Sequence, residues 1–174
     1  MRKHILINGL LIGIINSLGF VAMIFTNTHM NFEYGQLMGY GLMLAAFALV
    51  YLAVKRYRDN HLGGYINFGP ALFLGLMITL VASTIYVLSW LLVYYNFMPD
   101  FMERYAEATY EGLKNSKVKD LEIEEKMARI AKIADLYKHL PWVILLTYAE
   151  ILPVGTLASL VSSLVLRKSQ KPVA

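Results

Sequence analysis

One carboxylate stands inside a long apolar stretch of this sequence. Residues 142–166, WVILLTYAEILPVGTLASLVSSLVL, contain Glu150 and, shortly after it, Pro153. Hydrocarbon holds no bulk water, so a carboxyl group and the carbonyl that proline deprives of its hydrogen bond must be satisfied by neighbouring helices. The stretch therefore predicts a bundle around it, with Glu150 as the first candidate for chemistry and Pro153 as a helix kink.

No cation is expected at the depth of Glu150, because the apolar stretches contain no Lys, Arg or His there. We expect its carboxyl group to be neutral, since removal from water disfavours the charged form, and to need hydrogen bonds. Counting from the ends of the apolar stretches makes Tyr86 the best partner by depth. The candidate buried polar site comprises Glu150, Tyr86, Ser83, Trp90 and Asn16.

The helical wheel of residues 142–166 places Glu150 opposite a small-residue face made of Gly155, Ser159 and Ser163. Small residues allow helices to approach closely, so that face should pack against a neighbour. Three arrangements would explain how a Glu150 side chain on this face is packed. The helix packs on two sides, the kink reorients the carboxyl group, or Glu150 meets a second copy of the chain.

A narrow polar stripe runs along residues 70–95. Its members recur at helical spacing in an otherwise apolar segment: Gly75, Thr79, Ser83, Tyr86 and Trp90. Such a stripe faces protein or water. Hydrogen bonding between helices is the simpler interpretation, and a solute pathway is the alternative.

The motifs that carry catalysis are missing from the sequence. There is no HExxH, no Gly-Lys-Ser/Thr phosphate loop, no GxSxG, no GxGxxG and no cysteine. Four dispersed histidines are expected on opposite sides of a membrane, His4 and His61 inside and His29 and His139 outside. We therefore predict no catalytic residues, no metal, no cofactor and no enzyme activity.

The composition places the chain in a membrane. It is 57% hydrophobic and 16% charged, whereas about a quarter of residues are charged in soluble domains. Its 174 residues suit a single domain. The net charge of +4 does not point to nucleic acid, because the basic residues lie at membrane edges or among acidic residues. We therefore predict no nucleic-acid binding.

Four apolar stretches are long enough to span the bilayer: about residues 5–25, 36–54, 70–95 and 142–166. In the first, Gly9, Gly13, Asn16 and Ser17 share a helical face that should contact other helices. The second has small residues on two faces, which suits contact with neighbours on both sides. These faces are Gly41, Ala45 and Ala48, and Gly35, Gly39, Ala46 and Ala53.

Residues 97–140 are hydrophilic and carry two amphipathic patterns separated by Asn115 and Ser116. The first follows Phe101, Tyr105, Ala108 and Gly112, and the second follows Ile123, Met127, Ile130, Ala134 and Tyr137. Pro141 ends the second. We predict a helical hairpin between the third and fourth spans.

Among the short segments, basic residues flank the spans on one side only, if there are four spans. The longer hydrophilic stretch does not argue against this, because its eight Lys and Arg are matched by nine Asp and Glu. By the positive-inside tendency that side is cytoplasmic, so both termini are cytoplasmic and the hairpin is extracytoplasmic. These anchors are Arg2, Lys3, Lys55, Arg56, Arg58, Arg167 and Lys168.

Five stretches together resemble a known family: GQLMGYGLM, KRYRDNHLGGYINFGPALFLGL, ITLVASTIYVLSW, FMPDFMERYAE and EILPVGTLASLVSSLVLRK. The chain is similar over almost its whole length to the bacterial domain of unknown function 4199 family. The resemblance implies an all-α, four-helix integral membrane protein of the bacterial inner membrane. It implies no activity or ligand.

Two functions remain. The first is a non-enzymatic scaffold in the lipid bilayer, whose hairpin contacts an envelope protein. The second is a small carrier or proton-linked transporter that uses Glu150. Four spans are few for a carrier built from inverted repeats, so the second function requires a homo-oligomer.

Overall fold

The computed structural model describes residues 1–26, 32–116 and 119–168, and most of these residues are helical. His29, which the sequence predicts on the outer side, lies outside the described residues. In the described ranges, Ile66 and Lys168 pair as an isolated antiparallel β-bridge. The helices are α1 (Arg2–Thr26), α2 (Phe32–His61), α3 (Phe68–Phe97), α4 (Phe101–Asn115), α5 (Asp120–Tyr137) and α6 (Leu140–Leu166).

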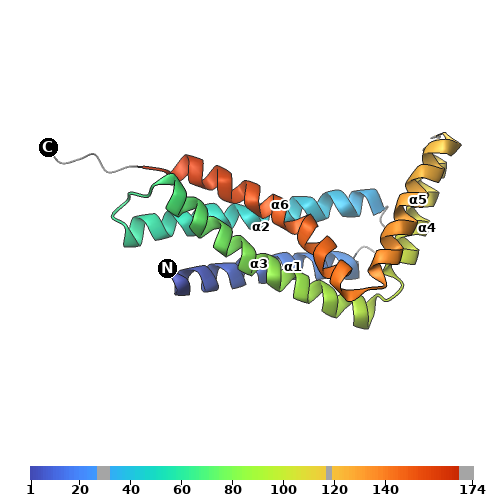
Figure 1. The fold of residues 1–174 in the computed structure, drawn as a ribbon, viewed down its shortest axis with the longest axis horizontal. Helices are drawn as coiled ribbons and strands as arrows, with labels where there is room; N and C mark the ends of the chain where they lie inside the picture. The colour runs from blue at the N-terminus through green and yellow to red at the C-terminus, as the bar shows by residue number, and fades with distance from the viewer. Residues whose placement is uncertain (27–31, 117–118, 169–174) are drawn as a thin grey trace.

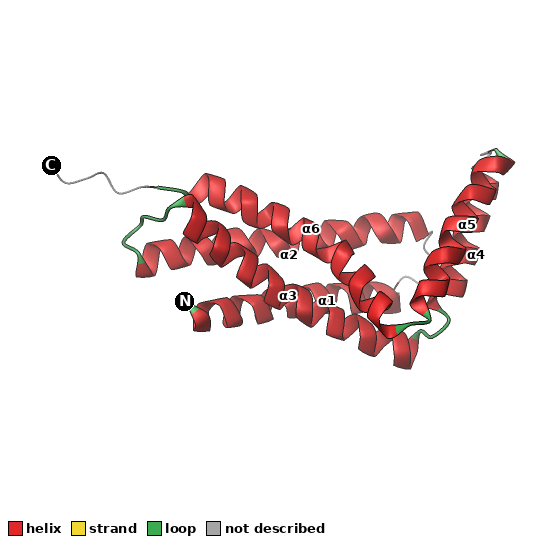
Figure 2. Cartoon of the chain, viewed as in Figure 1, coloured by secondary structure: helices red, strands yellow, loops and turns green. Residues whose placement is uncertain are grey.

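The four long helices, α1, α2, α3 and α6, pack together and form what we call the body (Figure 1). Within it, α3 packs most extensively against α6 and α1, and α2 contacts all three. The shorter helices α4 and α5 lie side by side and project from one end of the body (Figure 2). The N-terminus and the last turn of α6 lie at the opposite end.

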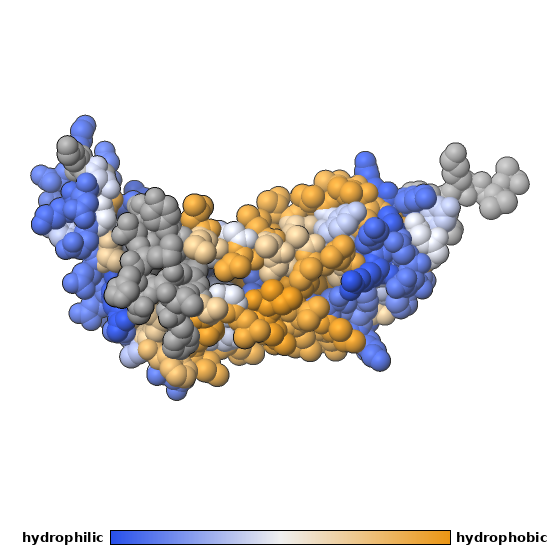
Figure 3. Space-filling view, turned by 180° about the vertical axis from the view of Figure 1, so that it is seen from behind, coloured by the Kyte–Doolittle hydropathy of each residue, from blue (hydrophilic) through white to orange (hydrophobic). Residues whose placement is uncertain are grey.

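Three helices are long and apolar enough to cross a membrane within the part of the chain that the structure describes. They are α2 from Leu37, α3 and α6, with mean hydropathies of 2.1, 2.3 and 1.7. Each overlaps one of the predicted spans, although α2 continues to His61, beyond the predicted end at residue 54. The predicted span at residues 5–25 lies in α1, where the side chains of residues 20 and 23–26 are outside the described set. Figure 3 shows a broad apolar band between two hydrophilic ends.

The small face predicted for α1 is confirmed, because Gly9, Gly13, Asn16 and Ser17 are all buried. A Cβ atom at Gly9 would lie 2.6 Å from that of Val81 in α3. Glycine is therefore required for α1 to approach α3 this closely.

The polar stripe of α3 faces the small face of α6. The Thr79 and Ser159 hydroxyl oxygens are 3.0 Å apart, and Thr79 also donates to the carbonyl of Gly155. A Cβ at Gly75 would lie 3.0 Å from that of Ser159. All five stripe residues are buried, as predicted: Gly75, Thr79, Ser83, Tyr86 and Trp90.

The prediction for α2 was half wrong. Ala46 and Ala53 are buried, but the face of Gly41, Ala45 and Ala48 is exposed. The other helices of the body contact α2, and among the described residues this face stays exposed while the one with Ala46 and Ala53 is covered.

The two short helices are in contact with each other, and they bury Met102 and Leu113 in α4 and Ile130 in α5. The sequence break is confirmed, since α4 ends at Asn115. Their charged side chains point outward, and the surface pairs Arg104–Asp100 and Lys138–Asp135 are 2.6 Å and 2.9 Å long. Exposed pairs of this kind add little stability, so the contact between α4 and α5 depends on the apolar residues.

Candidate functional site around Glu150

Glu150 lies in the first half of α6, at the edge of that helix's buried stripe. Its neighbours Val143, Thr147 and Ile151 are buried, whereas Glu150 itself is exposed at the surface of the chain. The expectation of a buried carboxyl group was wrong on this point. The small face opposite Glu150 takes the contact with α3, so Glu150 is left at the border of the packed surface.

Two tyrosine hydroxyl groups come within electrostatic range of the Glu150 carboxyl group. One belongs to Tyr86 of α3, the partner predicted by depth, and the other to Tyr137 at the end of α5. The Tyr137 hydroxyl accepts a hydrogen bond from the indole of Trp90 and is also bonded to Thr147. The structure thus places Tyr86 and Tyr137 in electrostatic range of Glu150, and Trp90 in contact with Tyr137.

Tyr137 keeps its proton at neutral pH. Burial, followed by the negative charge of Glu150, raises the pKa of its hydroxyl to about 12. A protonated phenol can donate a hydrogen bond to a carboxylate or to a ligand.

An aromatic cluster surrounds these polar groups where the body meets the short helices. The rings of Trp90 and Phe101 are 4.8 Å apart, those of Trp90 and Tyr94 5.8 Å, and those of Tyr94 and Tyr137 5.5 Å. We call Trp90, Tyr94, Phe101 and Tyr137 the junction cluster. It joins the end of α3, the start of α4 and the end of α5. Trp90 and Tyr94 are buried together with Val143 of α6, and Phe101 and Tyr137 are partly buried against them.

The other two predicted site residues lie deeper in the body. Asn16 of α1 is 5% exposed and Ser83 of α3 is fully buried. The Nδ2 atom of Asn16 and the Oγ atom of Ser83 lack hydrogen-bond partners. Both groups lie inside the helix bundle, whereas the Glu150 side chain is exposed.

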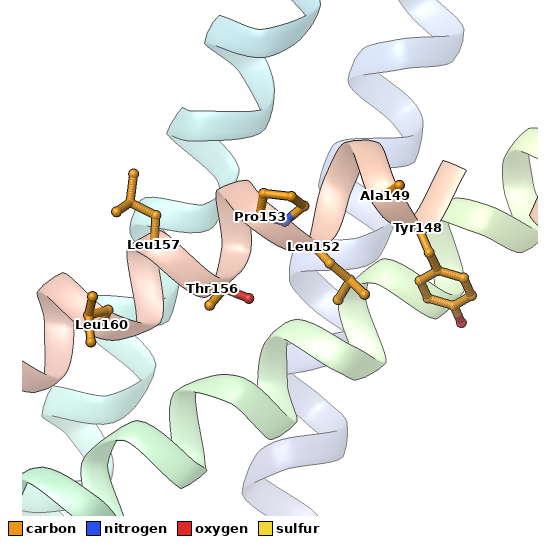
Figure 4. A pocket seen from close by; sticks show the side chains of 7 residues that line it. All are labelled: Tyr148, Ala149, Leu152, Pro153, Thr156, Leu157 and Leu160. Atoms are coloured by element: carbon orange, nitrogen blue, oxygen red, sulfur yellow. The ribbon is translucent and has the colours of Figure 1, made fainter. Parts of the chain in front are cut away.

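Pro153 shapes a shallow apolar groove on the outer side of α6 (Figure 4). Pro153 has no N–H to donate to the carbonyl of Ala149. Nearby, the Tyr148 hydroxyl lies 2.8 Å from that of Thr84 and connects α6 to α3. The groove is lined by Tyr148, Ala149, Leu152, Pro153, Thr156, Leu157 and Leu160, without Glu150.

The predicted basic anchors gather at the end of the body opposite α4 and α5. Arg58 donates from Nη1 to the carbonyl of Leu166 at 3.2 Å, and Lys168 exchanges two backbone hydrogen bonds with Ile66. The remaining anchors are exposed at the helix ends: Arg2, Lys3, Lys55, Arg56 and Arg167.

His4 and His61 meet at this basic end, a contact that their distance along the chain did not suggest. Their ring centroids are 6.1 Å apart, Tyr57 stacks on His61 at 4.8 Å, and His4 bonds the carbonyl of Ala53 at 2.8 Å. No group of three His, Asp or Glu side chains that could hold a metal occurs in the described ranges.

These features define an all-α protein with three helices that could span a membrane and an acidic group exposed on one of them. A family model described as Protein of unknown function (DUF4199) matches residues 7–168, so the chain belongs to that family. No match was found among curated proteins or solved structures.

Proposed function

We propose that the chain is an inner-membrane protein of bacteria with four spans, α1, α2, α3 and α6. Successive long helices run in opposite directions through the body, as in a chain that crosses a bilayer repeatedly (Figure 1). The basic residues at one end support cytoplasmic termini, because such residues favour the cytoplasmic side. On this proposal α4 and α5 form an extracytoplasmic hairpin.

The function that the geometry supports best is a non-enzymatic interaction role, in which α4 and α5 contact an envelope protein. One observation carries it. The two helices bury their apolar residues mainly against each other and project from the body, yet they leave Tyr110, Leu121 and Ile133 exposed. Leu121 is 68% exposed. On this proposal the three side chains belong to the contact surface, since apolar patches on a water-facing surface mark contact sites for other proteins.

The test is crosslinking in intact cells followed by purification under denaturing conditions. A variant with Tyr110→Ser, Leu121→Ser and Ile133→Ser should lose the crosslinked partner while remaining in the membrane. The matched control changes the exposed charged residues Glu107→Gln and Lys126→Gln, which should keep it. An unchanged set of crosslinked proteins in the triple variant would refute the interaction role.

A second candidate function is a small carrier that uses Glu150. It is favoured by the exposure of an acidic side chain on a helix able to span a membrane, because ionisable groups there often serve ions or solutes. Purified protein in vesicles should then show a flux that depends on Glu150. A flux that is equal in Glu150→Gln vesicles would exclude this function.

A further inference from the structure

The basic end of the body carries positive charge that the chain does not balance. In the described residues, seven Lys and Arg side chains, the predicted anchors, stand there beside one acid, Asp59. Asp59 is already paired with Arg58, whose Nε atom lies 2.7 Å from its carboxylate oxygen. Residues 97–140, at the opposite end, have eight Lys and Arg against nine Asp and Glu. The positive charge is therefore concentrated at one end of the molecule.

Hydrogen bonds hold part of this charge in a fixed place. The Nη1 atom of Arg58 donates to the carbonyl of Leu166 at 3.2 Å, which joins the end of α2 to the end of α6. Lys168 exchanges two backbone hydrogen bonds with Ile66, and its Nζ atom lies 5.2 Å from the centre of the Tyr65 ring. The ends of α2 and α6 and the segment before α3 thus form one continuous surface.

Within the described residues, three cations on this surface are left without an ion pair. Lys55 and Arg56 lie within one turn of Arg58 on α2, and Arg167 directly follows α6. All three side chains are exposed. An anion from outside the chain can therefore approach them.

The position of these cations selects the kind of anion. Figure 3 shows the hydrophilic end directly next to the apolar band. Leu52 is exposed one turn before Lys55, and Val165 is exposed two residues before Arg167. A soluble anion would contact the cations alone, whereas a phospholipid contacts the apolar side chains with its acyl chains and the cations with its headgroup. Lys and Arg side chains at a membrane surface attract anionic headgroups.

We propose that Lys55, Arg56 and Arg167 form a binding surface for the headgroups of anionic phospholipids such as phosphatidylglycerol. The negatively charged headgroup lies among the exposed cations, and the acyl chains run along Leu52 and Val165. The inference rests on the proposed placement of the chain in a bilayer. It does not depend on which end is cytoplasmic, on the interaction role of α4 and α5 or on the carrier candidate.

The test compares phosphatidylglycerol and phosphatidylcholine that carry the same spin label on an acyl chain, in phosphatidylcholine vesicles containing the purified full-length protein. Electron paramagnetic resonance gives the fraction of each labelled lipid held at the protein surface, and hence their relative association constants. One cation beside a headgroup favours an anionic lipid by about fivefold. Because the measurement averages over all lipids around the body, we expect a preference for phosphatidylglycerol of about twofold or more.

The variant Lys55→Gln, Arg56→Gln and Arg167→Gln should lose this preference. Its side chains are exposed, so thermal unfolding should show that it is folded. Orientation in the vesicles does not affect the result, because both leaflets contain the same lipids.

The matched control is Lys114→Gln, Lys126→Gln and Lys132→Gln, which removes the same number of exposed cations from α4 and α5 and should keep the preference. Glycerol 3-phosphate in solution should also leave the preference unchanged, compared with sodium chloride of equal ionic strength. Loss of the preference there would show that the cations take free phosphate instead and would overturn the inference.

Equal preferences in the two triple variants would overturn it as well. A protein that does not float with the vesicles would refute the proposed spans. A protein that inserts and binds both lipids equally would refute the lipid-binding surface alone.

Discussion

Gly155 shows how tightly single residues set the packing of α6. A Cβ atom there would collide with the methyl group of Thr79 and lie 2.7 Å from the Phe47 ring. Both neighbours are buried, and Phe47 is completely enclosed, so neither can move aside freely. The position joins α6 to α2 and α3 at once.

We therefore expect Gly155→Ala to destabilise the protein by about 1–3 kcal/mol, the usual cost of overpacking a core. The measurement is thermal unfolding of the purified protein in detergent. Gly41→Ala is the control, because a Cβ at Gly41 would have nothing within 4 Å. Alanine there should be neutral or slightly stabilising, since it favours the helix. Equal unfolding temperatures for the two variants would contradict the described packing.

Two substitutions of Glu150 test whether the charge of its side chain matters for the fold. Glu150→Gln keeps the size and hydrogen-bonding capacity of the side chain, so we expect normal abundance in the membrane. Glu150→Lys places a charge of the opposite sign next to two tyrosines without any acidic partner, so it should lower abundance. Quantitative immunoblotting of membrane fractions compares them. A Gln variant as scarce as the Lys variant would show that the negative charge itself maintains the fold.

The sequence predicted part of this site. Tyr86 could be paired with Glu150 because depth along two spans is countable from their ends. Tyr137 was recognised only as a member of an amphipathic face, since its place beside Glu150 depends on how α5 folds back onto α6. The exposure of Glu150 depends on which face of α6 the other helices occupy, and that is a property of the tertiary packing.

Among the elements, α4 and α5 depend least on the body. They contact each other and bury Met102, Leu113 and Ile130, while the junction cluster attaches them to α3 and α6. The amphipathic periodicity and Pro141 predicted the positions of these helices well, because amphipathic patterns and helix breaks are local signals in the sequence. The exposed face of Gly41 in α2 was not predictable, since small residues permit a contact but do not create one.

Replacing residues 98–139 with a short Gly/Ser linker should leave a protein that still inserts into the membrane. The spans retain their own contacts, including Gly9 with Val81 and Thr79 with Ser159. We expect a lower unfolding temperature, because Trp90 and Tyr94 lose aromatic neighbours. Membrane fractionation and alkaline extraction provide the measurement. Rapid degradation or failure to insert would mean that α4 and α5 are needed to build the fold.

The arrangement of the whole molecule predicts on which side of the membrane each of its two ends lies. Ser116 lies at the tip of the projecting helices and His61 at the basic end, and both are exposed. In intact cells, a membrane-impermeant thiol reagent should label Ser116→Cys and leave His61→Cys unlabelled. The chain has no native cysteine, so each variant reports one position. The opposite labelling pattern would reverse the proposed orientation.

The contacts at the basic end constrain how the body can rearrange. His4 joins α1 to α2 through the carbonyl of Ala53, Arg58 joins α2 to the end of α6, and Lys168 joins the chain after α6 to Ile66 before α3. All four long helices are thus fastened together at one end. If the helices tilt, they pivot there, and their displacement grows with distance from the pivot. The largest changes in spacing would then fall in the opposite half of the body, which contains Glu150.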